Sequence, residues 1–280
     1  MLIQTFRFIK NIKHKLKLSE RRGMSHESST MKSLVLLEVC ANSVTSALAA
    51  QDGGAARVEL CENLYEGGTT PSHGEILMAR KLLHIKIYVL IRPRGGDFLY
   101  TDLEFKVMKA DISYCIEAGC DGIVIGMLNP DGTIDKERCA ELVTMAKQWG
   151  MGVTFHRAFD MSSDMFQALE DIIEIGCERI LTSGGKSTAM EGSRALAELI
   201  EKAAGRIIIM PGCGISETNV ADLVHFTGAK EVHSSARVRV ESKMSHKNDR
   251  IIMGDNYGDE YSSDVTDAGR VKTILKLANG

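Results

Sequence analysis

Several features that mark other classes of protein are missing from this 280-residue chain. It has no run of about 18 apolar residues, so no transmembrane helix is expected. Its seven cysteines are an odd number without CxxC or CxxH spacing, which argues against a disulfide framework or a structural zinc site and favours reduced thiols in a cytosolic protein. Aromatic residues make up only 5 %, whereas the 26 glycines suit a repeated strand–loop–helix architecture.

Basic charge is scarce outside the N-terminal segment. Residues 1–32 hold eight Lys or Arg and two acids, while the rest of the chain holds 26 basic and 35 acidic residues. The acidic body argues against nucleic acid as a partner. The composition of residues 1–20 is typical of a mitochondrial presequence, but a disordered basic extension or a later start at Met24 or Met31 is the simpler explanation. We expect residues 1–32 to be a disordered extension and residues 33–280 to fold.

From residue 33 onward, a short aliphatic run followed by a loop and a helix-like segment recurs eight times. The runs are Leu34–Cys40, Arg57–Cys61, Ile85–Arg92, Gly122–Ile125, Gly152–His156, Arg179–Ser183, Arg206–Met210 and Glu231–Ser235. Each is short and bounded by Gly, Pro or Ser, as buried parallel strands are. Eight such units in about 248 residues predict a single (β/α)8 TIM barrel.

One competing fold and one exceptional segment accompany this pattern. A doubly wound open sheet normally carries GxGxxG after its first strand, where this chain has Ala41-Asn42-Ser43. Residues 237–264 fit no repeat, because they are rich in Ser, Asp, Lys and Asn. We expect them to form a long loop, which is usually functional or disordered.

The first two predicted strands end in the same E-x-C pattern. If the aliphatic residues between them face the helices, then Glu38, Cys40, Glu59 and Cys61 all face into the barrel. Neighbouring strands lie only about 4.8 Å apart, so the two thiols can meet. Thiolates are soft donors that favour Cu(I), and the alternative is that the cysteines simply line a pocket. Cys115, Cys120, Cys139 and Cys177 are expected to be ordinary core residues.

Other strand ends add polar side chains to the same rim. A barrel bottom is normally filled by Val, Ile and Leu, so this polarity is expected at the C-terminal mouth, where barrel active sites lie. Glu38 and Glu59 are candidates for general acid and base, or for ion-pair partners of arginines that follow strands three and five. His156 is the best-placed general base, with a hydrogen-bonded core histidine as the alternative. The complete set of catalytic or pocket candidates is Glu38, Glu59, Arg92, His156, Arg157, Asp160 and Ser183.

A second candidate site follows the last two strands. Barrels commonly bind phosphate with these loops, because glycine backbones approach an anion closely and a helix N-terminus favours negative charge. We therefore expect an anion site formed by Gly212, Gly214, Ser234, Ser235 and Arg237.

Long motifs in this chain resemble the copper homeostasis protein CutC family, over about Leu34 to Arg237. They are Glu38-Val39-Cys40, Arg57-Val58-Glu59-Leu60-Cys61, Glu66-Gly67-Gly68-Thr69-Thr70-Pro71-Ser72, Arg92-Pro93-Arg94-Gly95-Gly96-Asp97-Phe98-Leu99-Tyr100, Val107-Met108-Lys109-Ala110-Asp111, Thr154-Phe155-His156-Arg157-Ala158-Phe159-Asp160 and Arg179-Ile180-Leu181-Thr182-Ser183-Gly184. The resemblance implies a TIM barrel, a cytoplasmic and in animals also nuclear location, a homo-oligomer (dimer or tetramer), and Cu(I) ligands at Cys40 and Cys61. It also shows two departures: Cys213 replaces the middle glycine of the usual Pro-Gly-Gly-Gly-Ile, and Ser234 stands where vertebrate members tend to have Cys.

Three function classes follow from these patterns. The first is a copper-binding protein that buffers or delivers Cu(I) through the cysteine pair. The second is an enzyme acting on a small anionic, phosphate-bearing substrate with the Glu, His and Arg cluster. The third is a non-catalytic barrel that works through its oligomer surface. The polar mouth favours the first two.

Overall fold

The computed structural model describes residues 34–248, 250–251, 253 and 260–280. The basic extension at residues 1–32, with its targeting interpretation, lies outside the described residues. In the described part of the chain, no helix is both long and apolar enough to cross a membrane.

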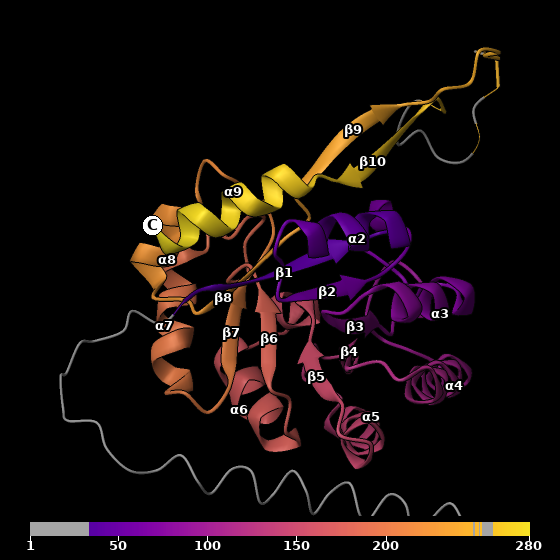
Figure 1. Ribbon diagram of the computed structural model, residues 1–280. Helices are drawn as coiled ribbons and strands as arrows, with labels where there is room; N and C mark the ends of the chain where they lie inside the picture. The colour runs from indigo at the N-terminus through magenta and orange to yellow at the C-terminus, as the bar shows by residue number, and fades with distance from the viewer. Residues whose placement is uncertain (1–33, 249, 252, 254–259) are drawn as a thin grey trace, which may run out of the picture. The chain divides into compact units, whose positions relative to one another are not determined.

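Eight parallel strands form the centre of the fold (Figure 1). They are β1 (Leu36–Ala41), β2 (Arg57–Leu60), β3 (Lys86–Leu90), β4 (Gly122–Ile125), β5 (Gly152–Phe155), β6 (Arg179–Thr182), β7 (Ile208–Pro211) and β8 (Glu231–Ser234). Consecutive strands pair from β1 to β7, and β1 also pairs with β8. The first and last strands pair, as the predicted barrel requires, and the fold is a (β/α)8 barrel.

The barrel has one seam without a hydrogen-bonded ladder among the described strands, between β7 and β8. A side chain bridges this seam instead, because the buried Ser234 hydroxyl donates to the carbonyl of Ile215 at 2.7 Å. The backbone after β7 also lies close to β8, since a Cβ on Gly212 would be 3.3 Å from the Cβ of His233.

Helices alternate with the strands and surround them (Figure 1). They are α2 (Val44–Asp52), α3 (His73–Leu82), α4 (Asp102–Ala118), α5 (Lys136–Gln148), α6 (Met165–Ile175), α7 (Ser193–Ala203), α8 (Val220–Thr227) and α9 (Ala268–Asn279), with short 3-10 turns η1 (Leu64–Glu66) and η2 (Arg157–Met161). Local sequence sets their ends. A capping box of Thr101 and Glu104 starts α4, and Gly119 ends it at a φ of 76°, which glycine adopts without strain.

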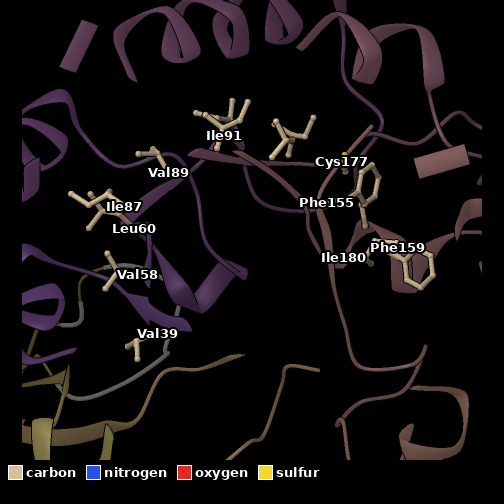
Figure 2. Packing of buried hydrophobic residues seen from close by; sticks show 14 of the residues in the cluster. Val39, Val58, Leu60, Ile87, Val89, Ile91, Phe155, Phe159, Cys177 and Ile180 are labelled. Carbon is tan, nitrogen blue, oxygen red and sulfur yellow. The ribbon is translucent and has the colours of Figure 1, made fainter. Parts of the chain in front are cut away.

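The main hydrophobic core lies between the strands and the helices. Figure 2 shows part of it, including Val39, Val58, Leu60, Ile87 and Val89 along neighbouring strands. These aliphatic residues alternate with the polar residues of the E-x-C patterns, so the polar residues face the barrel interior as predicted. The four cysteines expected to be core residues all belong to this core: Cys115, Cys120, Cys139 and Cys177.

The barrel interior below the mouth is polar, which corrects our expectation of an aliphatic plug. Arg57 and Arg179, at the starts of β2 and β6, and Glu231, at the start of β8, are buried there. Arg57 donates to Glu231 at 2.6 Å and Arg179 donates to it at 3.0 Å. The two guanidinium groups also lie 5.0 Å and 5.1 Å from the centre of the Tyr88 ring. Because the arginines and the glutamate pair with one another, the attraction between them offsets the cost of burying their charges in the barrel interior, where apolar side chains were expected.

The segment after β8 differs from the long loop we expected. Strands β9 (Arg237–Glu241) and β10 (Ser262–Thr266) pair as an antiparallel ribbon that extends from the barrel (Figure 1). The amide of Thr266 donates to the Ser46 hydroxyl of α2 at 3.2 Å, which ties the base of the ribbon to the barrel. The polar composition hid these strands because neither face of the ribbon is fully buried.

Candidate functional site

The two cysteines of the E-x-C patterns meet at the barrel mouth. Their Sγ atoms lie 3.5 Å apart, and both thiols are buried and free. The strand register makes this contact diagonal, because Cys40 of β1 stands opposite Glu59 of β2 rather than opposite Cys61. The same register sets Glu38 opposite Arg57. The mouth therefore holds Cys40 between a second thiol and a carboxyl group.

His233 of β8 connects the two glutamates. Its Nδ1 lies 2.8 Å from Oε1 of Glu38, and its Nε2 lies 3.6 Å from Oε2 of Glu59. Potential ligand atoms of Cys40, Glu59 and His233 all lie within 4.8 Å of one another. His233 was not among the site residues predicted from the sequence. Its register position beside Glu38 was the available signal, and that position depends on how β8 pairs with β1.

Burial and charge set the protonation of this group. Burial alone would raise the pKa of Glu38, but Arg57 and the hydrogen bond to His233 outweigh it and lower that pKa to about 2. Burial would lower the pKa of His233, but hydrogen bonds to Cys40 and Glu38 and the charges of both glutamates raise it well above its usual value. Glu59 has a raised pKa, mainly because it is buried. The hydrogen bond to Cys61, and then burial, raise the pKa of Cys40, so this sulfur is a thiol at neutral pH.

The glutamates do not pair with the arginines considered from the sequence. Glu38 pairs with Arg57 and His233, within the interior layer described above. Arg157 pairs with Asp160 at 2.8 Å. The register of a closed barrel, which a linear sequence does not display, decided these partners.

Arg92 follows β3 and is held by backbone carbonyl groups. Its Nη1 donates to the carbonyls of Glu66 at 2.7 Å and Gly68 at 2.6 Å, and its Nη2 donates to that of Gly96 at 2.8 Å. Arg92 is only 5 % exposed and forms no ion pair with a carboxylate among the described residues. Its Nε has no hydrogen-bond partner there either.

His156 follows β5 and presents a hydrogen-bond donor rather than the base we expected. Its Nδ1 accepts from the amide of Ala158 at 3.1 Å, so the proton of the neutral ring is on Nε2. Burial, followed by the nearby charge of Arg92, lowers the pKa of His156 to about 3. The ring is neutral at physiological pH and a weak base, and its Nε2 has no partner among the described residues.

Asp160 organises the loops after β5 and β6. It accepts hydrogen bonds from the amides of Ser183 at 3.1 Å and Gly185 at 2.9 Å. Arg157 donates to the Ser183 hydroxyl at 2.9 Å. These contacts bring Arg157, Asp160 and Ser183 together, as the sequence predicted, and occupy most of their polar atoms.

The candidates for an anion site lie around the loops after β7 and β8. Arg237 donates to the Ser235 hydroxyl at 3.1 Å and lies 3.6 Å from Asp264. Gly214 has a φ of 75°, and its neighbour Cys213 has a φ of 77°, where glycine is strain-free and cysteine is not. The Cys213 thiol lies 3.0 Å from the carbonyl of Ser187, away from the thiol pair. Anion binding here stays a prediction.

A pocket of about 290 Å³ unites most of the mouth residues. Its lining is Cys40, Glu59, Cys61, Gly67, Leu90, Arg92, Phe98, His156, Arg157, Asp160, Met161, Leu181 and His233. Both thiols, the Glu59–His233 pair, Arg92 and His156 thus line one space, whose size suits a small ligand. This is a (β/α)8 barrel with a thiol, imidazole and carboxyl cluster at its mouth.

Comparison with known proteins identifies the family. A model described as the CutC family matches residues 35–238. The copper homeostasis protein cutC homologs of Mus musculus and Homo sapiens are each 48 % identical over 244 residues, covering 87 % of this chain and 89 % of theirs. A family protein CutC from Xylella fastidiosa is 49 % identical over 241 residues, or 86 % of this chain and 88 % of its own. The chain therefore belongs to the CutC copper homeostasis family.

Solved structures agree with this assignment. CutC from Streptococcus agalactiae has a TM-score of 0.69 at 36 % identity, covering 72 % of this chain and 99 % of its own. Thiamine phosphate pyrophosphorylase from Pyrococcus furiosus has a TM-score of 0.53 at 13 % identity, covering 88 % of this chain and 96 % of its own. The second likeness concerns the barrel fold alone.

Proposed function

We propose that this protein binds Cu(I) through Cys40 and Cys61 and thereby buffers or delivers copper. The observation that supports this most directly is the 3.5 Å separation of two free thiols on the wall of a pocket. Thiolates are the protein ligands that Cu(I) prefers. Copper is the cargo in this proposal, and the barrel supplies its ligands.

The geometry favours a third ligand in addition to the sulfur pair. With metal–sulfur bonds of about 2.3 Å, the length known for zinc, a linear unit separates the sulfurs by about 4.6 Å and a trigonal one by about 4.0 Å. The trigonal arrangement needs the smaller movement from 3.5 Å. His233 is the neighbouring nitrogen donor, because its ligand atom lies within 4.8 Å of the Cys40 sulfur, and imidazole is a suitable ligand for copper. We therefore expect His233 to support binding by the two thiols.

Copper binding would release protons from this site. The raised pKa of Cys40 keeps its thiol protonated at neutral pH, and a metal ion binds the thiolate. A proton must also leave Nε2 of His233 if that nitrogen coordinates copper. The interior charges of Arg57 and Arg179 lie below the site and offset the negative charge of the glutamates.

An anaerobic titration with Cu(I), against a chromophoric chelator, tests the proposal. The wild-type protein should bind one tight equivalent per chain in the reduced state. Cys40→Ser or Cys61→Ser should abolish tight binding, because one remaining thiolate cannot hold the ion alone. The matched control is Cys177→Ser, which removes a buried thiol from the main core and should leave binding unchanged. A double Cys40→Ser, Cys61→Ser variant that still binds one tight equivalent would contradict the proposal.

A second candidate function is an enzyme for a small phosphate-bearing substrate. The buried pair of Glu59 and His233 on the pocket wall favours it, because a carboxyl group with a raised pKa beside an imidazole is suited to proton transfer. The test is to follow a panel of sugar phosphates by phosphorus NMR with the wild type and Glu59→Gln. Turnover by the wild type alone, without tight copper binding, would favour the enzyme.

The same proposal includes a cytoplasmic and nuclear homo-oligomer. It is supported by family membership, because the resemblance implies both properties. Sedimentation of the full-length chain and imaging of a tagged copy test them. A monomer at micromolar concentration, or a mitochondrial signal directed by residues 1–20, would overturn the corresponding part.

A further inference from the structure

We propose that the pocket contains a subsite for the carboxylate of a small organic acid, formed by Arg92 and His156. This subsite lies beside the thiol pair but requires no metal. It goes beyond copper binding, and it differs from the anion site expected at the loops after β7 and β8.

Arg92 is a buried cation that has no carboxylate partner in the described part of the chain. Three backbone carbonyls hold two of its nitrogens, and carbonyl dipoles do not neutralise its charge. A buried charge is costly unless an opposite charge accompanies it. The Tyr100 hydroxyl is the other polar side chain close to the guanidinium, and it is neutral. Arg92 forms no ion pair among the described residues and its Nε makes no hydrogen bond there, so its charge is left for an anionic ligand.

His156 supplies a second donor on the same wall. It is 5 % exposed, and its Nε2–H has no acceptor among the described residues. The Arg92 guanidinium carbon lies 5.1 Å from the centre of the Phe98 ring. The centre of the His156 ring lies 5.0 Å from the centre of the same Phe98 ring. Because both side chains pack on Phe98 and line one pocket, their donors can serve one ligand.

The donors and the volume indicate the class of ligand. Two N–H groups and one positive charge match the two oxygens and single charge of a carboxylate. The pocket of about 290 Å³ admits only a small molecule, and Leu90, Met161 and Leu181 give it an apolar lining for a short hydrocarbon part.

The subsite is joined structurally to the thiol pair. Arg92 donates to the carbonyl of Gly68, and a Cβ on Gly68 would lie 3.9 Å from Sγ of Cys61. An acid bound to Arg92 would therefore lie next to the site proposed for copper. The proposed acid and copper sites line the same pocket, so acetate binding is measured in the absence of copper.

Binding of acetate to the metal-free protein tests the subsite, with inorganic phosphate as the comparison. Saturation-transfer NMR on the acetate methyl group reports binding directly. We expect Arg92→Gln to weaken acetate binding about tenfold or more, because it removes a hydrogen bond to a charged group together with the cation. The control Arg94→Gln removes the same charge two residues away, from a side chain that pairs with Glu104 and Asp97, and should change binding less than about twofold.

His156→Asn covers the case in which Arg92→Gln fails to fold. Asn can still accept a hydrogen bond from the amide of Ala158 but lacks the Nε2 donor, so acetate binding should weaken by several-fold. The proposal is overturned if the wild type binds no acetate at millimolar acetate concentrations, or if phosphate binds and acetate does not. It is also overturned if Arg94→Gln weakens acetate binding as much as Arg92→Gln does. Acetate binding is measured on the metal-free protein and Cu(I) binding in the separate chelator titration, so the failure of one proposal is distinguishable from the failure of the other.

Discussion

Burial of neutral His156 makes the stability of this barrel depend on pH. Its pKa is about 3 in the folded protein and about 6.5 in an unfolded chain, so the unfolded state binds more protons between these values. The stabilisation from keeping this ring neutral is present above pH 6.5 and is lost as the pH falls toward 3. Linkage gives a loss of about 2 kcal/mol between pH 7 and pH 5 from this one residue.

The variant His156→Asn isolates this contribution. It is expected to be less stable than the wild type at pH 7, but its stability should fall by about 2 kcal/mol less between pH 7 and pH 5, because asparagine does not titrate. Urea denaturation of the metal-free proteins at both pH values measures the four free energies of unfolding, and equal m-values justify their comparison. The contributions of other titrating groups cancel when the change in unfolding free energy between pH 7 and pH 5 is compared between the variant and the wild type.

The matched control replaces the exposed His225 of α8 with Asn. It should reproduce the pH dependence of the wild type, because His225 is not buried. The reasoning is refuted if His156→Asn and the wild type lose the same stability on acidification. It is also refuted if NMR shows the His156 ring titrating near pH 6.5.

Three other predictions concern the interior charges, the thiols and the second loop site. Arg57→Met should destabilise the protein by about 3–5 kcal/mol in urea denaturation, because buried Glu38 and Glu231 lose a shared cation, and adding Glu38→Gln should restore part of this. Cu(I) affinity should fall at least about tenfold per pH unit between pH 8 and pH 6 in chelator competition, and a pH-independent affinity would contradict thiol deprotonation. Crystals grown in high sulfate should show the ion near Gly212 and Gly214, and an empty site there while others fill would exclude that anion site.

The repeated runs were sufficient to predict the barrel, because buried parallel strands need an aliphatic face whatever their neighbours are. The E-x-C patterns also predicted correctly that Cys40 and Cys61 face inward and meet. The ribbon of β9 and β10 was missed, since its strands lack a fully buried face and so lack the alternation that reveals a strand.

The partners of the polar residues required the tertiary structure. The stagger between β1 and β2 sets Cys40 against Glu59, and pairing of β8 with β1 brings His233 to Glu38 from 195 residues away. The sequence by itself determined which residue types reach the barrel interior, because alternation along a strand is a local property. Only the closed barrel decided which of them touch, and whether His156 acts as base or donor, because register and burial depend on contacts distant in the sequence.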